Sequence, residues 1–120
     1  MMNFACKNFR SIDIIKCGLG LTRAELTIFL HFLKNEEETL TANTLSNKVD
    51  LELTTVQKAL KKMREKDLLE KNQVNLENGG YFFEYKIRPK SEIRRILKEI
   101  IRKWTEHIEK KVEKKDFFEL

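Results

Sequence analysis

The segment from residue 51 to residue 66 constrains the fold more than any other part of the chain. Four of its apolar residues follow the spacing i, i+3, i+4 and i+7, which places them on one stripe of a helix. They are Val56, Ala59, Leu60 and Met63. Between residues 53 and 66, five cationic side chains stand against the single acidic Glu65, for a net charge of +4. A short helix with one apolar face and one basic face is typical of a helix that meets phosphate groups.

The stretches on either side indicate how this basic helix is held. Residues 41–49 predict a two-turn helix with Thr41 as its N-cap. A link of only three residues follows, so the two helices form a helix-turn-helix unit. Downstream, two β-favouring runs at residues 70–76 and 81–87 flank the turn Glu77-Asn78-Gly79-Gly80, which predicts a β-hairpin. Helix, turn, basic helix and hairpin together predict a winged helix.

Helical patterns also precede and follow this unit. A short helix is expected from Ser11 to Gly18. Thr22 and Glu25 form a capping box before a helix expected to bury one apolar stripe. That stripe consists of Leu26, Phe29, Leu30 and Leu33. Leu40 is expected to add a short strand to the hairpin.

The C-terminal part predicts one long helix, capped by Ser91 and running to about Lys115. Its apolar residues recur at spacings of three and four over about six turns. They are Ile93, Ile96, Leu97, Ile100, Ile101, Trp104, Ile108 and Val112. A helix of ~25 residues spans ~37 Å, more than the width of a domain this small, so part of the stripe is expected to contact another chain. The residues expected to form this dimer contact are Ile93, Leu97, Ile100, Ile101, Trp104 and Ile108.

These elements predict a mainly α fold with a small β-hairpin. The expected division is an N-terminal helical segment at 1–20, a winged-helix DNA-binding domain at 21–88 and a C-terminal dimerisation helix at 89–120.

The sequence resembles those of winged-helix transcriptional regulators of the MarR and archaeal TrmB or Lrs-like type. The likeness covers roughly residues 19 to 88. It rests on Leu21-Thr22-Arg23-Ala24-Glu25, Leu45-Ser46, Leu51 with Thr54-Thr55-Val56, and Ala59 to Lys66 before Leu68-Leu69. Many relatives carry Arg or Lys at the tip of the hairpin, whereas residues 77–80 carry no cation. The resemblance implies a DNA-binding regulator that dimerises through its N-terminal and C-terminal helices. A cytoplasmic location is expected from the sequence itself, which shows no secretory signal pattern and no long apolar run.

Duplex DNA offers a major groove wide enough for an α-helix, so the helix at 53–66 is expected to insert its N-terminal part there. The side chains expected to face base edges are Thr54, Thr55, Gln57 and Lys58. Lys48, Lys61 and Lys62 are expected to contact phosphates. A homodimer would present its two copies of the helix at 53–66 to successive major grooves.

Composition supports an anionic partner and argues against several other classes. The net charge is +5, and all of the excess lies beyond residue 50. The sequence shows no paired-carboxylate pocket, nucleophile elbow, Gly-rich phosphate loop or clustered His, so no enzyme activity, cofactor or metal site is expected. No apolar run predicts a membrane span. Cys6 and Cys17 are expected to be buried or half-buried free thiols, with redox sensing as the alternative.

Three alternatives remain open at the level of sequence. A winged helix can act as a protein-interaction module or coat DNA without specificity; salt-sensitive DNA binding separates a DNA binder from an interaction module. The aromatic residues of the hairpin, Tyr81, Phe83 and Tyr85, are expected to pack against the helices, with base stacking as the alternative. The last open point is a small-molecule effector, for which a cleft between the long helix and the DNA-binding part would be the expected site.

Overall fold

The computed structural model describes residues 2–4 and 7–120, with side chains from Arg10 onward. Its elements, in chain order, are β1 (Met2–Phe4), β2 (Lys7–Phe9), α1 (Ser11–Leu19), α2 (Arg23–Lys34), α3 (Ala42–Val49), α4 (Leu53–Glu65), β3 (Leu69–Asn75), β4 (Tyr81–Ile87) and α5 (Lys90–Glu113). The fold is mainly helical, with a β3–β4 hairpin and a long C-terminal helix, which confirms the predicted fold class. The β1–β2 hairpin was not predicted.

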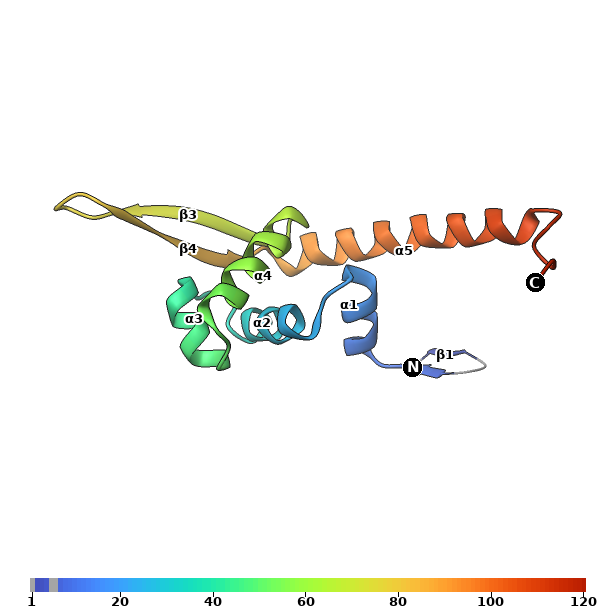
Figure 1. Cartoon of the computed structure of the whole chain (residues 1–120), viewed down its shortest axis with the longest axis horizontal. Coiled ribbons are helices and arrows are strands. Elements are labelled where there is room, and N and C mark those ends of the chain that lie inside the picture. Colours follow the sequence, from blue (N-terminus) through green and yellow to red (C-terminus); the bar gives the residue numbers. More distant parts are fainter. Residues whose placement is uncertain (1, 5–6) are drawn as a thin grey trace.

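The molecule is elongated, with principal extents of 66 × 28 × 24 Å. Helices α1 to α4 form the body, and two elements project from it in opposite directions (Figure 1). The β3–β4 hairpin, here called the wing, extends at one end and α5 at the other. The wing and the outer part of α5 therefore lie at opposite ends of the long axis.

One hydrophobic core joins the helices to the base of the wing. Helix α4 contributes the four apolar residues expected from the sequence, all of them buried. Helix α2 contributes Ile28, Phe29 and Phe32 as fully buried residues, whereas Leu26, Leu30 and Leu33 are half-buried. The prediction was therefore wrong about which side of α2 is fully buried. Six large apolar residues lie around this helix, so their spacing alone does not show which side meets α4.

Local signals place the ends of the helices. The Thr22 Oγ1 accepts the Glu25 N–H at 3.2 Å and the Glu25 carboxylate accepts the Thr22 N–H at 2.9 Å, which confirms the capping box. Thr41 caps α3 through the Thr44 N–H at 3.1 Å. The expected Ser91 cap is absent: α5 starts at Lys90, Pro89 is its N-cap, and this end has no side-chain cap hydrogen bond. Proline suits this position because it cannot donate a backbone hydrogen bond and the first helical turn needs no such donor.

The wing is an antiparallel pair in which Asn75 pairs with Tyr81 and Leu69 with Ile87. Its turn uses Gly79 and Gly80, which have φ values of 85° and 87°. Residues other than Gly, Asn and Asp rarely adopt such φ values, which explains why Asn-Gly-Gly occurs at this turn. Leu40 pairs with Tyr85 as an isolated antiparallel bridge, with backbone hydrogen bonds of 2.8 and 2.7 Å. The predicted short strand at Leu40 is confirmed in that form.

The first part of α5 packs on α1. Ile93 is buried in the core at 5% exposure, and Leu97 packs against it. Gly18 leaves so little room that an added Cβ would meet the Leu97 Cδ2 at 2.9 Å. The helix leaves the body after these turns, and every residue from Ile100 onward is exposed.

The prediction for the cysteines was wrong at Cys17, which is a free thiol on the exposed side of α1. On this helix Leu19 is buried in the core and Ile15 packs against it, whereas Cys17 is exposed. Cys6 lies outside the described residues.

Candidate nucleic-acid interface

The α3–α4 unit has the geometry that the sequence predicts. Helix α3 ends at Asp50, whose backbone is left-handed with φ of 54°, and α4 begins at Leu53. The Ser46 hydroxyl donates a hydrogen bond to the Leu51 carbonyl and so closes the turn. The short link fixes the angle between the helices, and the apolar stripe of α4 faces the core.

The face of α4 that points away from the core carries the expected DNA-contacting residues. Thr54, Gln57, Lys58, Lys61 and Lys62 are exposed. Thr55 is half-buried and lines a hollow of about 420 Å³ between α4 and the start of α2. Five of the six predicted contact residues of α4 are thus fully available to a ligand, and Thr55 is available only in part.

The cations of α4 divide into two groups. Lys58, Lys61, Lys62 and Arg64 form no ion pair within the part of the chain that the structure describes. Lys66 instead donates from its Nζ to the Leu19 and Gly20 carbonyls, at 2.9 and 3.0 Å. It therefore satisfies carbonyls at the C-terminal end of α1, where a cation is favourable. The sequence analysis counted Lys66 among the cations of the basic face. Its true partners lie 47 and 46 residues away in the sequence, and no nearby residue indicates them.

Lys48, the predicted phosphate contact on α3, is held by an acidic loop. Its Nζ lies 3.7 Å from Glu38. The neighbouring Glu37 lies 3.7 Å from Lys86 at the base of the wing, and Glu36 lies 3.1 Å from Lys90 at the start of α5. These pairs are exposed and individually worth little, so a phosphate group can compete for Lys48.

The predicted packing of the wing aromatics is confirmed only at the inner end. Tyr85 packs against the core, and Phe83 is half-buried. Tyr81, nearer the tip, is 59% exposed. The tip itself holds no cation, so an arginine inserted into a minor groove is absent from this wing.

A second hollow, of about 660 Å³, lies between α4 and the edge strand β3. Four cationic side chains line it, interspersed with Glu65, Asp67 and Glu70. They are Lys61, Arg64, Lys71 and Arg88. Burial raises the pKa of Tyr85, and the charge of nearby Arg64 opposes that rise. The basic side of α4 therefore continues onto the inner end of the wing.

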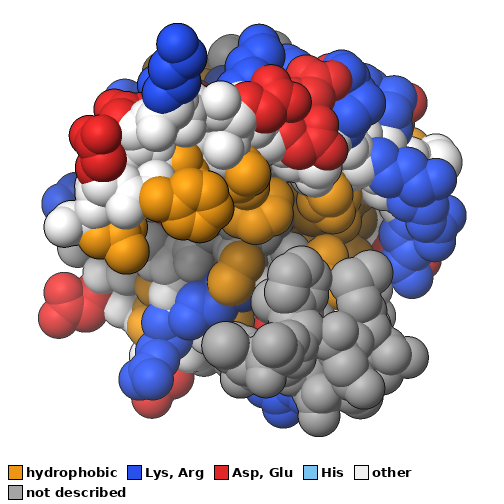
Figure 2. Space-filling model, turned by 90° about the vertical axis from the view of Figure 1, so that its right-hand side faces the viewer, with side chains coloured by type: hydrophobic (Ala, Val, Ile, Leu, Met, Phe, Trp, Pro, Cys, Tyr) orange, Lys and Arg blue, Asp and Glu red, His pale blue; other side chains and the backbone are white. Residues whose placement is uncertain are grey.

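The outer two thirds of α5 have one apolar side and one charged side. Its exposed apolar residues include Ile100, Ile101, Trp104, Ile108 and Val112. Viewed from the end that α5 faces, hydrophobic side chains form one band bordered above by charged ones (Figure 2).

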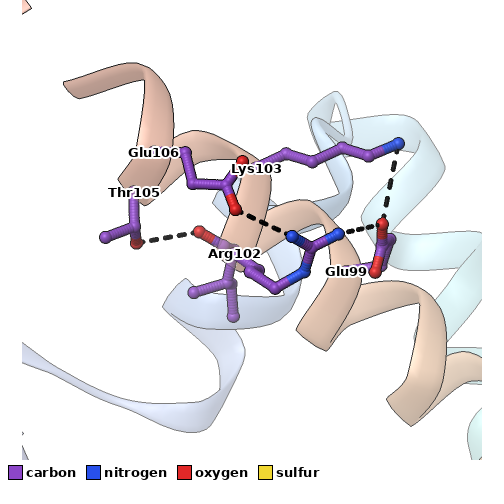
Figure 3. Close-up of polar contacts among 6 residues, drawn as sticks. Glu99, Arg102, Lys103, Thr105 and Glu106 are labelled. Atoms are coloured by element: carbon purple, nitrogen blue, oxygen red, sulfur yellow. Dashed lines mark hydrogen bonds and ion pairs between the residues drawn. The ribbon is translucent and has the colours of Figure 1, made fainter. Parts of the chain in front are cut away.

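On the charged side, Arg102 bridges Glu99 at 2.7 Å and Glu106 at 2.8 Å, and Lys103 lies 3.7 Å from Glu99 (Figure 3). The Arg102 hydrogen bond lowers the pKa of Glu99. These i,i+3 and i,i+4 pairs stabilise the helix without needing a partner. The apolar band, by contrast, has no covering element among the described residues.

No grouping of His, Cys, Asp and Glu suited to a metal ion occurs among the described residues. Within the same residues, none of the helices has the length and apolar character needed to cross a membrane.

Comparison with known proteins places this arrangement among relatives. The chain matches the DnaD N-terminal domain family over residues 11–115. Its fold is similar to that of a "possible transcriptional regulator" from Methanosarcina mazei Go1, with a TM-score of 0.84, 38% identity and 93% of each chain covered. It is also 24% identical over 117 residues to the uncharacterized protein MJ1503 of Methanocaldococcus jannaschii, covering 98% of this chain and 87% of the relative.

A more distant likeness, to a protein from the thermoacidophilic archaeon Sulfolobus tokodaii, has a TM-score of 0.66 and 22% identity over 80% of this chain and 92% of that one. It shows the fold alone. The family match and the likeness to the Methanosarcina mazei protein support a winged-helix-like regulator. The family that matches is that of DnaD N-terminal domains, and no specific link to MarR, TrmB or Lrs-like regulators emerges from them.

Proposed function

The chain belongs to the DnaD N-terminal domain family, and from that premise we propose that it is a sequence-specific double-stranded DNA-binding transcriptional regulator that acts as a homodimer. The observation that carries the proposal is the exposed face of α4, on which Gln57 lies together with Lys58, Lys61 and Lys62. The likeness to the Methanosarcina mazei protein adds support for a regulatory role.

In this proposal the N-terminal half of α4 enters the major groove. Gln57 hydrogen-bonds an adenine, Lys58 a guanine, and the Thr54 methyl group contacts a thymine methyl. Lys61 and Lys62 lie one turn further along the helix and contact phosphates, where they contribute affinity without reading sequence. Lys48 exchanges its Glu38 partner for a phosphate.

The homodimer forms through the apolar band of α5 from Ile100 to Val112. Ile93 is not part of this contact, because it is buried in the core of its own chain. Leu97 packs on α1 and borders the contact. Burying five apolar side chains from each copy supplies the hydrophobic driving force that a stable dimer needs. Two-fold symmetry then presents two copies of α4 to a palindromic site.

The test is the salt dependence of duplex binding. Replacing Lys58 and Lys61 by Ala is expected to weaken binding to a selected site. The slope of log affinity against log salt should fall by about one unit for each phosphate that the protein no longer neutralises. A matched control replaces Lys114 and Lys115 by Ala, which removes the same charge from the C-terminal end of α5, beyond the apolar band and far from α4.

Fluorescence anisotropy with labelled duplex between about 50 and 200 mM salt measures both effects. An unchanged slope in the Lys58 and Lys61 variant, or an equal loss of affinity in the α5 control, would place the DNA contact elsewhere. Selection of bound sequences from random duplexes, repeated with Gln57→Ala, is expected to relax preference at one base position. That change corresponds to a loss of roughly 1–3 kcal/mol of discrimination.

A further inference from the structure

One face of the wing combines aromatic rings with polar side chains. The strand register places Lys71 opposite Tyr85, Gln73 opposite Phe83 and Asn75 opposite Tyr81. Because side chains alternate along a strand, these residues share one face. Its part beyond the core, here called the aromatic wing face, consists of Lys71, Gln73, Asn75, Tyr81 and Phe83.

The rings of this face are held in a defined arrangement. Phe83 meets Tyr81 edge to face, with centroids 5.3 Å apart and planes at 67°. The Lys71 Nζ sits 3.9 Å from the Phe83 centroid, so a cation covers that ring. Gln73 donates to the Asn75 side-chain oxygen at 2.9 Å. Phe83 therefore supports Tyr81 from the inner side, while the Tyr81 ring itself remains 59% exposed.

The outer wing offers the phosphates of a nucleic acid no cation, so binding there depends on the rings. Between Lys71 and Lys86 the chain carries Glu77 and Glu84 and no cation. In a duplex the flat faces of the bases are stacked on one another, so an aromatic ring beside the duplex would meet only sugar and phosphate. In a single strand those faces are free, and stacking on an aromatic side chain contributes affinity whatever the base.

Cations stand where the backbone of such a strand would run. Lys71 lines the hollow that also holds Lys61 and Arg64 of α4, so the aromatic wing face is continuous with the basic side of that helix. Lys71 lies four residues along the strand from Asn75, the pairing partner of Tyr81, which is about 13 Å at ~3.3 Å per residue. A strand whose base stacks on Tyr81 can therefore place phosphates a few nucleotides further along against these three side chains, and the side-chain amides of Gln73 and Asn75 lie beside the stacked base.

We propose that the aromatic wing face binds single-stranded DNA by stacking an unpaired base on Tyr81. This contact uses the rings of the wing, which the duplex contact of α4 proposed above does not use, and it shares Lys61 with that contact. It gives the protein a site for the unpaired strand wherever a duplex is opened or ends.

The test uses the full chain and a labelled oligothymidine of about 15 nucleotides, a length in the range that one stacking surface covers. Tyr81→Ala is expected to weaken single-strand binding at least about fivefold, because stacking is worth roughly 1–3 kcal/mol per base. Tyr81→Phe keeps the ring and should bind within about twofold of the native chain. Phe82→Ala removes a ring of 38% exposure from the opposite face and serves as the matched control.

Duplex binding is measured on the same variants. Tyr81→Ala should leave duplex affinity within about twofold, whereas the Lys58 and Lys61 double variant should lower it. The inference is overturned if the native chain does not bind the oligothymidine, if Phe82→Ala weakens binding as much as Tyr81→Ala, or if Tyr81→Ala lowers duplex binding equally. A change in dimer mass for Tyr81→Ala would also overturn it, because the face would then be a contact between copies. Loss of duplex binding alone would refute the regulator and leave this site standing.

Discussion

Trp104 provides the sharpest test of the dimer. It lies in the middle of the apolar band of α5 and is 62% exposed in the single chain. A tryptophan side chain buries roughly 150–250 Å², so on the order of 120 Å² of each copy remains for a partner to cover. At ~25 cal/mol per Å² this area corresponds to ~3 kcal/mol per copy, and two copies contribute to one dimer.

Part of that energy is offset by ordering side chains at the interface, and alanine retains some contact. We therefore expect Trp104→Ala to raise the dimer dissociation constant at least about 100-fold, equivalent to roughly 2.8 kcal/mol. Sedimentation equilibrium over a range of concentrations measures this constant directly. Tyr81→Ala is the matched control, since it removes a similarly exposed aromatic ring from the opposite end of the molecule.

The reasoning is refuted if the dimer dissociation constant of Trp104→Ala lies within about threefold of that of the native chain. It is also refuted if the native chain is a monomer at tens of micromolar, which corresponds to an association free energy weaker than on the order of −6 kcal/mol. Equal weakening by Tyr81→Ala would also refute it, since both exposed rings would then act by general adhesion.

Two further predictions concern stability and the wing. Lys66→Met removes a part-buried hydrogen bond to the Leu19 carbonyl and an exposed one to the Gly20 carbonyl, and it is expected to lower the free energy of unfolding by about 1–3 kcal/mol in urea titrations. Lys62→Met, at an exposed position, should change it by less than about 0.5 kcal/mol, and equal effects would contradict the assigned role of Lys66. Shortening the turn at 77–80 to Asn-Gly should cost duplex affinity less than about tenfold in anisotropy titrations, because the tip carries no cation. A larger reduction would mean that the tip contacts DNA.

Local signals made the winged helix predictable. The caps at Thr22 and Thr41, the period of α4 and the glycines at the wing turn each act within a few residues, and each has the expected geometry. Asp50 shows the same point, because aspartate is among the few residues besides glycine that tolerate a left-handed backbone.

The features that could not be predicted from the sequence depend on contacts between distant segments. The role of Lys66 requires knowing that the end of α4 meets the end of α1. The pairing of Glu36, Glu37 and Glu38 with three separate lysines likewise depends on how the loop lies against α3, the wing and α5. The exposure of Tyr81 follows from how far the wing reaches beyond the helices, and strand periodicity carries no information about that length. These contacts decide which cations and rings remain exposed on the surface of the molecule.

The contact of Lys66 with α1 also bears on the order in which the chain acquires its structure. The two hydrogen bonds span 47 and 46 residues of sequence. Contacts over such separations form late, because the intervening chain must first be ordered. Helix α1 is synthesised before the other helices, yet its last carbonyls gain their lysine partner only when α4 is in place. Its C-terminal turn should therefore be among the last parts of the body to become protected from hydrogen exchange.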